Sequence, residues 1–170
     1  MSFIRVKNIK GQKYAYLVEN EWTPWGSRQK VIKYLGKIHK PKKQDKQQKE
    51  AEQEEIQEQN ITKKAVIQEL LKHGFSRQDT NMTLGSIKVN IERLEVRQNN
   101  KKITLEMNEG YMCDETLKQL RDFKAEENPE RTIPKLAKTI LEAGLKPETQ
   151  ETVKIYETKA KIIKNNKTPQ

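Results

Sequence analysis

A long polar segment sets the strongest limit on how this 170-residue chain can fold. Residues 40–59 consist almost entirely of Lys, Gln and Glu, and they contain too few apolar side chains to form a packed face. They predict either a solvated helix, supported by pairs such as Lys46–Glu50, or a disordered tether. In both cases the segment is a spacer, which divides the chain into residues 1–39 and residues 60–164.

The first unit has the pattern of a small antiparallel sheet. Residues 2–9, 13–20 and 29–38 alternate apolar and polar side chains, and turn-forming Gly, Pro and Ser residues lie between these stretches. Connections this short favour a three-stranded meander. The third stretch is expected to end near Gly36, because glycine interrupts strands.

The alternation predicts which side chains share a face. In the second stretch, Ala15 and Leu17 should be buried, and Tyr14 and Tyr16 should lie on the outer face. The third stretch is ambiguous, but a regular strand with Leu35 turned inward would turn four other side chains outward: Arg28, Lys30, Ile32 and Tyr34.

The second unit has a mixed pattern. A helix is expected after Asn60, a β-hairpin around Asn99-Asn100, and then three helices, the first of them capped by Asp114. The alternation shifts near Glu92-Arg93, which indicates a β-bulge or a strand that changes the face it buries. The predicted fold class is therefore α+β: a small basic three-stranded antiparallel sheet, a charged helical or disordered spacer, and an α+β unit with one β-hairpin and about four helices. A frayed tail is expected at residues 165–170.

Positive charge is concentrated in the first quarter of the chain. The net charge is +10, and residues 1–47 carry twelve Lys or Arg against three acids, which accounts for +9 of it. Six of the ten aromatic residues lie in the first 34 positions. Basic residues interleaved with rings are typical of a nucleic-acid-binding surface, although they could also keep a half-buried sheet soluble. The candidate binding residues are Arg5, Lys7, Lys10, Lys13, Tyr14, Tyr16, Trp22, Trp25, Arg28, Lys30, Lys33, Tyr34 and Lys37.

No pattern in the sequence indicates catalysis. The two histidines, His39 and His73, and the single Cys113 are too few and too scattered for a metal site. His73 is interpreted as favourable charge at a helix C-terminus, and Cys113 as a small buried apolar side chain. Phosphate-binding glycine loops and nucleophile motifs are not found. We expect no enzyme activity, no cofactor and no metal.

The segment from Phe3 to Lys37 contains the runs FIRVK, KYAYLVEN and RQKVIKYLGK. This combination resembles the opening segment of insertion-sequence DDE transposases, which precedes their catalytic core. The resemblance implies contact with DNA, the role ascribed to that segment. A DDE core needs three separated carboxylates on a large mixed sheet, and residues 60–164 offer no such triad, so the resemblance does not extend to transposition. The later run NEGYMCDETLKQLRDF resembles uncharacterised archaeal proteins with the same N-terminal segment.

These patterns predict a non-enzymatic nucleic-acid-binding protein, and the resemblance implies that it derives from a transposase and lacks the catalytic core. DNA is the favoured ligand, and RNA is the alternative. The sheet could enter a duplex groove, or its tyrosines and tryptophans could stack on unpaired bases. Packing of Trp22 and Trp25 against the sheet is the alternative role for those two rings.

A second interpretation is an interaction protein. Residues 60–164 would then bind a protein partner or a second copy of the chain, while the basic unit docks on RNA or a ribosome. No stretch is long and apolar enough for a membrane span or a signal peptide, so we expect a cytoplasmic protein without membrane attachment.

Overall fold

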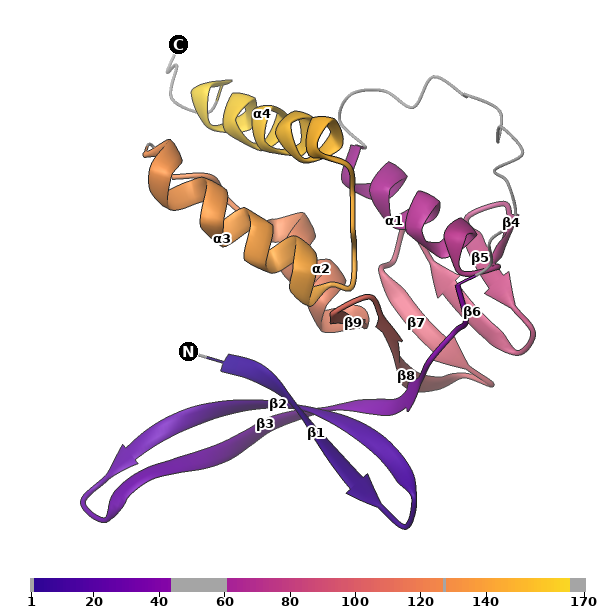
Figure 1. Cartoon of the computed structure of the whole chain (residues 1–170), viewed down its shortest axis with the longest axis vertical. Helices are drawn as coiled ribbons and strands as arrows, with labels where there is room; N and C mark the ends of the chain where they lie inside the picture. Colours follow the sequence, from indigo (N-terminus) through magenta and orange to yellow (C-terminus); the bar gives the residue numbers. More distant parts are fainter. Residues whose placement is uncertain (1, 44–60, 127, 166–170) are drawn as a thin grey trace.

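The computed structural model describes residues 2–43, 61–126 and 128–165 (Figure 1). Most of the predicted spacer, residues 44–59, and most of the predicted tail, residues 166–170, therefore lie outside the described residues. The described residues form nine strands and four helices. None of these helices is long and apolar enough to cross a membrane.

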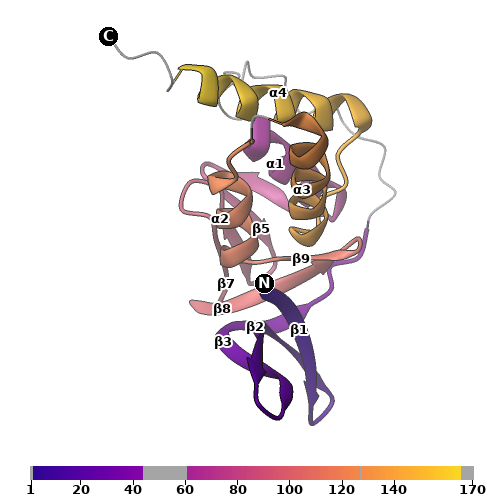
Figure 2. The same ribbon diagram turned by 90° about the vertical axis from the view of Figure 1, so that its left-hand side faces the viewer.

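The N-terminal strands form an antiparallel meander, by which we mean residues 2–39. β1 (Ser2–Ile9) pairs with β2 (Gln12–Thr23), and β2 pairs with β3 (Gly26–His39). The two hairpin turns lie at opposite ends of the meander (Figure 1), and both point away from the helices (Figure 2).

The end of β3 joins the meander to the rest of the protein. It pairs in parallel with β8 (Lys101–Met107), through the matches Lys37–Ile103, Ile38–Thr104 and His39–Leu105. β8 also pairs with β7 (Glu95–Gln98) and with β9 (Gly110–Met112). The described strands therefore form one nine-stranded mixed sheet, in the order β1-β2-β3-β8-β7-β6-β5-β4, with β9 paired to β8.

The predicted fold class is wrong on this point. The three basic strands are not a separate small sheet, because the parallel ladder to β8 makes them part of the large one. The second unit also has six strands, β4 to β9, where a single hairpin was predicted. Some of the missed strands have only three or four residues, too few to show a clear alternation.

Tight turns separate these short strands. β4 (Ser76–Gln78), β5 (Asn81–Leu84) and β6 (Ile87–Asn90) pair successively in antiparallel fashion. The shift expected near Glu92-Arg93 is neither a bulge nor a change of face, because residues 91–94 form the turn that connects β6 to β7.

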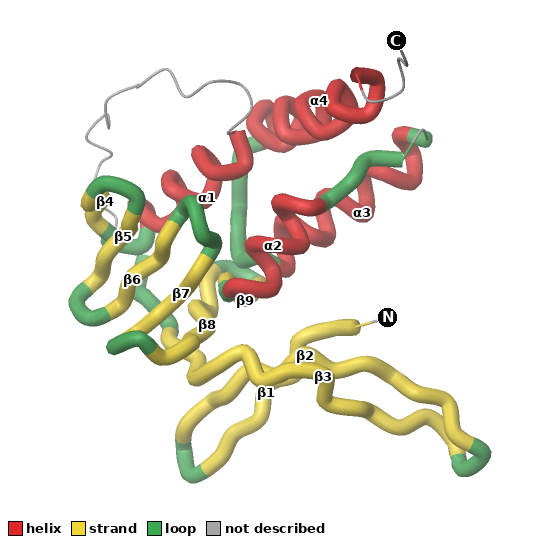
Figure 3. The backbone as a smooth tube through the Cα atoms, turned by 180° about the vertical axis from the view of Figure 1, so that it is seen from behind, coloured by secondary structure: helices red, strands yellow, loops and turns green. Residues whose placement is uncertain are grey.

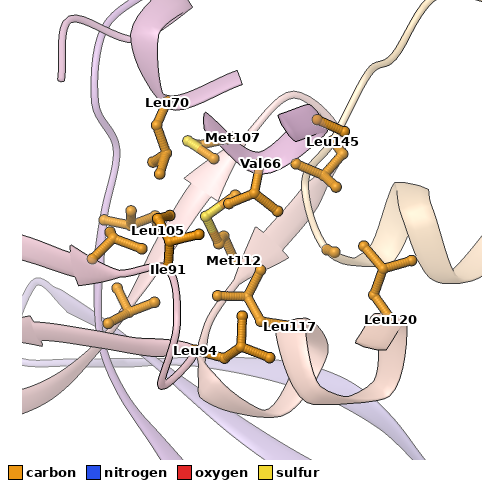
Figure 4. Close-up of a cluster of buried hydrophobic side chains, with 14 of the residues drawn as sticks. Val66, Leu70, Ile91, Leu94, Leu105, Met107, Met112, Leu117, Leu120 and Leu145 are labelled. Atoms are coloured by element: carbon orange, nitrogen blue, oxygen red, sulfur yellow. The ribbon is translucent and has the colours of Figure 1, made fainter. Parts of the chain in front are cut away.

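Four helices pack on one side of the strands of the second unit (Figure 3). They are α1 (Ile61–Lys72), α2 (Asp114–Asp122), α3 (Pro129–Glu142) and α4 (Thr149–Asn165). Each of them contributes apolar side chains to one buried cluster, and Leu70, Leu105, Met112, Leu117 and Leu120 are fully or almost fully buried there (Figure 4). Burying this apolar surface is the main force that holds helices and sheet together.

The start of α2 differs from the prediction. Cys113, not Asp114, is the N-cap residue, and its backbone N–H donates to Thr116 Oγ1 at 3.0 Å. The Asp114 carboxylate instead accepts hydrogen bonds from Arg97 Nη1 at 2.7 Å and from the Val96 N–H at 2.9 Å. Asp114 therefore ties the beginning of α2 to β7.

A glycine allows β3 to approach β8 closely. Gly36 has φ +114°, and a Cβ atom there would lie 2.4 Å from the Lys102 carbonyl oxygen and 2.7 Å from Ile103 Cα. The strand does not end at this glycine as expected, but continues to His39. The Thr104 hydroxyl completes the junction by donating to the Leu35 carbonyl at 3.0 Å.

We expect Gly36→Ala to lower the free energy of unfolding by about 2 kcal/mol or more, because strain at positive φ and overpacking against β8 act together. Urea titration followed by circular dichroism measures the loss. Gly11→Ala is the matched control, since Gly11 also has positive φ but has no atom near its would-be Cβ. It should cost only about 1 kcal/mol. Equal losses for the two variants would contradict the close approach of β3 to β8.

Candidate nucleic-acid interface

Pairing of the strands places six of the predicted binding residues on one face of the meander. Across β1 and β2, Arg5 lies opposite Tyr16 and Lys7 opposite Tyr14. Across β2 and β3, Tyr16 lies opposite Tyr34, and Tyr14 opposite Lys37. We call this set the tyrosine face: Arg5, Lys7, Tyr14, Tyr16, Tyr34 and Lys37.

Tyr34 contacts both of the other tyrosines of this face. The ring centroids of Tyr16 and Tyr34 are 5.4 Å apart, and those of Tyr14 and Tyr34 are 6.3 Å apart, both in tilted arrangements. Lys7 Nζ lies 5.0 Å from the centre of the Tyr16 ring, a cation–π distance. Burial, and then the neighbouring Tyr16 and Tyr14, raise the pKa of Tyr34 above its usual value. Like any tyrosine at neutral pH, Tyr34 keeps its hydroxyl proton and can donate a hydrogen bond.

No acidic side chain lies on the tyrosine face within the described strands. The meander has two acids, Glu19 and Glu21, and both alternate onto the opposite face, where they lie across from Lys30 and Arg28. None of the ion pairs among the described residues involves the cations of the tyrosine face. Arg5 is held by donation from its Nη1 to Gln29 Oε1. These charges are therefore available to an anionic ligand.

The opposite face, which we call the docking face, attaches the meander to the rest of the protein. Ala15, Leu17, Leu35 and Ile38 are buried there in one small cluster with Cys113. Burial of this apolar surface turns the tyrosine face away from the helices.

Ion pairs surround the small cluster. Lys33 Nζ lies 2.6 Å from Glu115, and the hydrogen bond between them raises the pKa of Lys33. Glu106 accepts from Lys40 at 3.0 Å and lies 3.9 Å from Lys13. Lys13 and Lys33, both predicted to bind a ligand, therefore lie on the docking face with acidic partners from outside the meander.

The remaining predicted residues are spread over the meander. Arg28 and Lys30 lie on the docking face, beyond the small cluster, whereas a regular strand would have put them beside Tyr34. Lys10 is in the turn between β1 and β2. Trp22 and Trp25 lie at the tip of the β2–β3 hairpin, largely exposed rather than packed on the sheet.

Two irregularities in β3 explain the change of face. The register shifts between Ala15 and Tyr16 and again between Leu17 and Val18, which leaves Leu35 and Ile32 without a direct partner in β2. Each extra residue reverses the alternation in β3. As a result Gln29, which is not among the predicted binding residues, lies on the same side as the tyrosines. The one available signal was Gly36, since a glycine inside a strand often marks a bulge.

A hollow beside the meander does not suit a polyanion. A hollow of about 180 Å³ lies between β1 and the segment from β9 to α3, but Glu109, Glu115 and Glu142 line it, and their charge disfavours phosphate. The described residues contain no group of three or more His, Cys, Asp and Glu side chains that could hold a metal ion.

A buried polar cluster holds the second unit together. The Glu69 carboxylate accepts from Asn108 Nδ2 at 2.8 Å and lies 3.4 Å from His73 Nδ1. These contacts connect the C-terminal end of α1 with the β8–β9 turn. Asn108 Nδ2 also donates to the Gly144 carbonyl at 2.9 Å. His73 and Glu69 are both almost completely buried, so this cluster is closed to a large ligand.

Comparison with family models, curated proteins and solved structures finds no significant match. The resemblance of residues 3–37 to transposases therefore stays a prediction.

We expect the Cys113 thiol to be unreactive in the folded protein. It is 1 % exposed, and burial raises its pKa, so the thiolate that attacks aromatic disulfide reagents is scarce at neutral pH. A colorimetric thiol assay should show very slow labelling in buffer and rapid labelling in denaturant. Fast labelling of the folded chain would show that the meander separates readily from α2.

Proposed function

We propose that the protein binds nucleic acid, with DNA as the favoured ligand, through the tyrosine face and without catalysing a reaction. One observation carries the proposal: three cations without acidic partners lie beside three tyrosines, of which Tyr34 contacts the other two, on a face of the meander that has no acid. Cations neutralise phosphates and release condensed counterions, and aromatic rings stack on bases or pack on sugars.

The charge balance of the docking face supports the same proposal. Its basic residues are matched by Glu106 and Glu115, or lie across from Glu19 and Glu21, so they add little net charge. The excess charge of the meander is therefore concentrated on the tyrosine face. The preference for DNA over RNA comes from the transposase-like segment alone.

The charge-neutralised triple variant Arg5→Gln, Lys7→Gln and Lys37→Gln tests the proposal. We expect log K for DNA to depend less steeply on log salt, with the slope reduced by about 2 to 3, because each lost phosphate contact removes about 0.7 to 0.9. Fluorescence anisotropy of a labelled oligonucleotide across a salt series measures the slope, and an RNA oligonucleotide of the same sequence measures the preference for DNA.

The matched control is the triple variant Arg28→Gln, Lys30→Gln and Lys33→Gln, which changes the net charge equally but lies on the docking face. It should leave most of the salt slope intact. An equal effect of the two triple variants would contradict the choice of face. Failure of the unmodified chain to bind any nucleic acid near physiological salt would overturn the proposed function.

A further inference from the structure

The tip of the β2–β3 hairpin carries the two most exposed large apolar side chains among the described residues. Trp22 is 84 % exposed and Trp25 is 87 % exposed, whereas the next, Val153, is 49 % exposed. An indole ring has a large surface whose burial is strongly favourable, and exposed rings of this kind mark binding surfaces.

The hairpin holds these rings at a defined place. Trp22 lies opposite Ser27, and Thr23 lies opposite Gly26 at the last matched position of the ladder. Thr23 Oγ1 donates to the Gly26 carbonyl at 2.7 Å and closes the turn that contains Trp25. Pro24 restricts the backbone there further.

Trp22 shares a face with the tyrosines. β2 itself alternates regularly, because both extra residues belong to β3, so Tyr14, Tyr16 and Trp22 all point to the same side. Trp22 lies six positions after Tyr16, which corresponds to about 20 Å along a strand. Tyr14, Tyr16 and Trp22 therefore lie on one face of β2, with Val18 and Asn20 between Tyr16 and Trp22.

We propose that the tyrosine face and the hairpin tip together bind single-stranded nucleic acid, with Trp22 and Trp25 stacking on unpaired bases; this rests on the proposed function. The faces of bases inside a duplex are covered by their neighbours, so they are available to an indole only where the strand is unpaired. The indole rings lie at the hairpin tip, and the cations and tyrosines lie at the other end of β2. This arrangement suits a single strand of nucleic acid that runs along the hairpin.

The charge at the tip argues against an anionic membrane as the partner. Residues 19–31 contain two acids, Glu19 and Glu21, and two bases, Arg28 and Lys30, so this half of the hairpin is neutral. Insertion of rings into an anionic bilayer is usually helped by cations around the inserting side chains. Here the unpaired cations lie on the tyrosine face, away from the tip.

Tryptophan emission reports on the tip alone, because the chain contains only these two tryptophans. The full chain is titrated with oligothymidine, with a blunt DNA duplex, and with phosphatidylcholine–phosphatidylserine vesicles. We expect oligothymidine to quench the emission in step with binding measured by anisotropy, and the duplex to bind with little quenching. A response to vesicles together with no quenching by oligothymidine would overturn the inference in favour of a membrane.

Two substitutions at one position separate stacking from simple apolar contact. Trp25→Leu should weaken oligothymidine binding about 5- to 100-fold, and Trp25→Phe should retain most of the affinity, since only phenylalanine keeps a ring that can stack. Ile133→Ala, which changes an exposed apolar residue on α3, should have no effect. Equal affinity of the Leu and Phe variants would overturn stacking.

The outcomes distinguish this inference from the proposed function on which it rests. Binding of oligothymidine and duplex without any change in emission would overturn the role of the tip, and the tyrosine face would remain the interface. If the chain binds neither oligothymidine nor the duplex, both the role of the tip and the proposed function are overturned.

Discussion

The short parallel ladder between β3 and β8 is the contact on which the arrangement of the whole protein depends. It has three matched residue pairs, yet it joins the meander to all the other strands. Gly36 makes the approach sterically possible, and the Thr104 hydroxyl donates to the carbonyl of Leu35, a residue that the irregular register leaves without a matched residue in β2. Polar backbone groups at such a buried junction need these partners, because an unsatisfied one is costly.

The same junction determines which cations remain for a ligand. The meander carries many basic residues, but those around the small docking cluster are paired with Glu106 and Glu115. Docking therefore sorts a uniformly basic segment into a balanced face and a positively charged one. A ligand meets a surface defined by Arg5, Lys7 and Lys37 rather than by the total charge of the segment.

The features of the fold that depend on residues close together in the sequence could be predicted from the sequence. Regular alternation along β2 was enough to place Tyr14 and Tyr16 on one face and Ala15 and Leu17 on the other. The parallel ladder could not be predicted, since β8 lies far away in the sequence and nothing in β3 identifies its partner. The face of Arg28 and Lys30 was missed because the extra residues in β3 reverse an alternation that the sequence pattern assumes to be regular.

The distance along the chain between the two sides of the junction has a consequence for the order of folding. The hydroxyl and carbonyl that join Thr104 to Leu35 are 69 residues apart in sequence. During synthesis the hairpins of the meander can form from local contacts as soon as they emerge, but the docking face has no partner until β8 and α2 have been made. Until then Leu17, Leu35 and Ile38 face solvent. The nascent chain therefore passes through a stage in which an aggregation-prone apolar surface and a positively charged surface are both exposed.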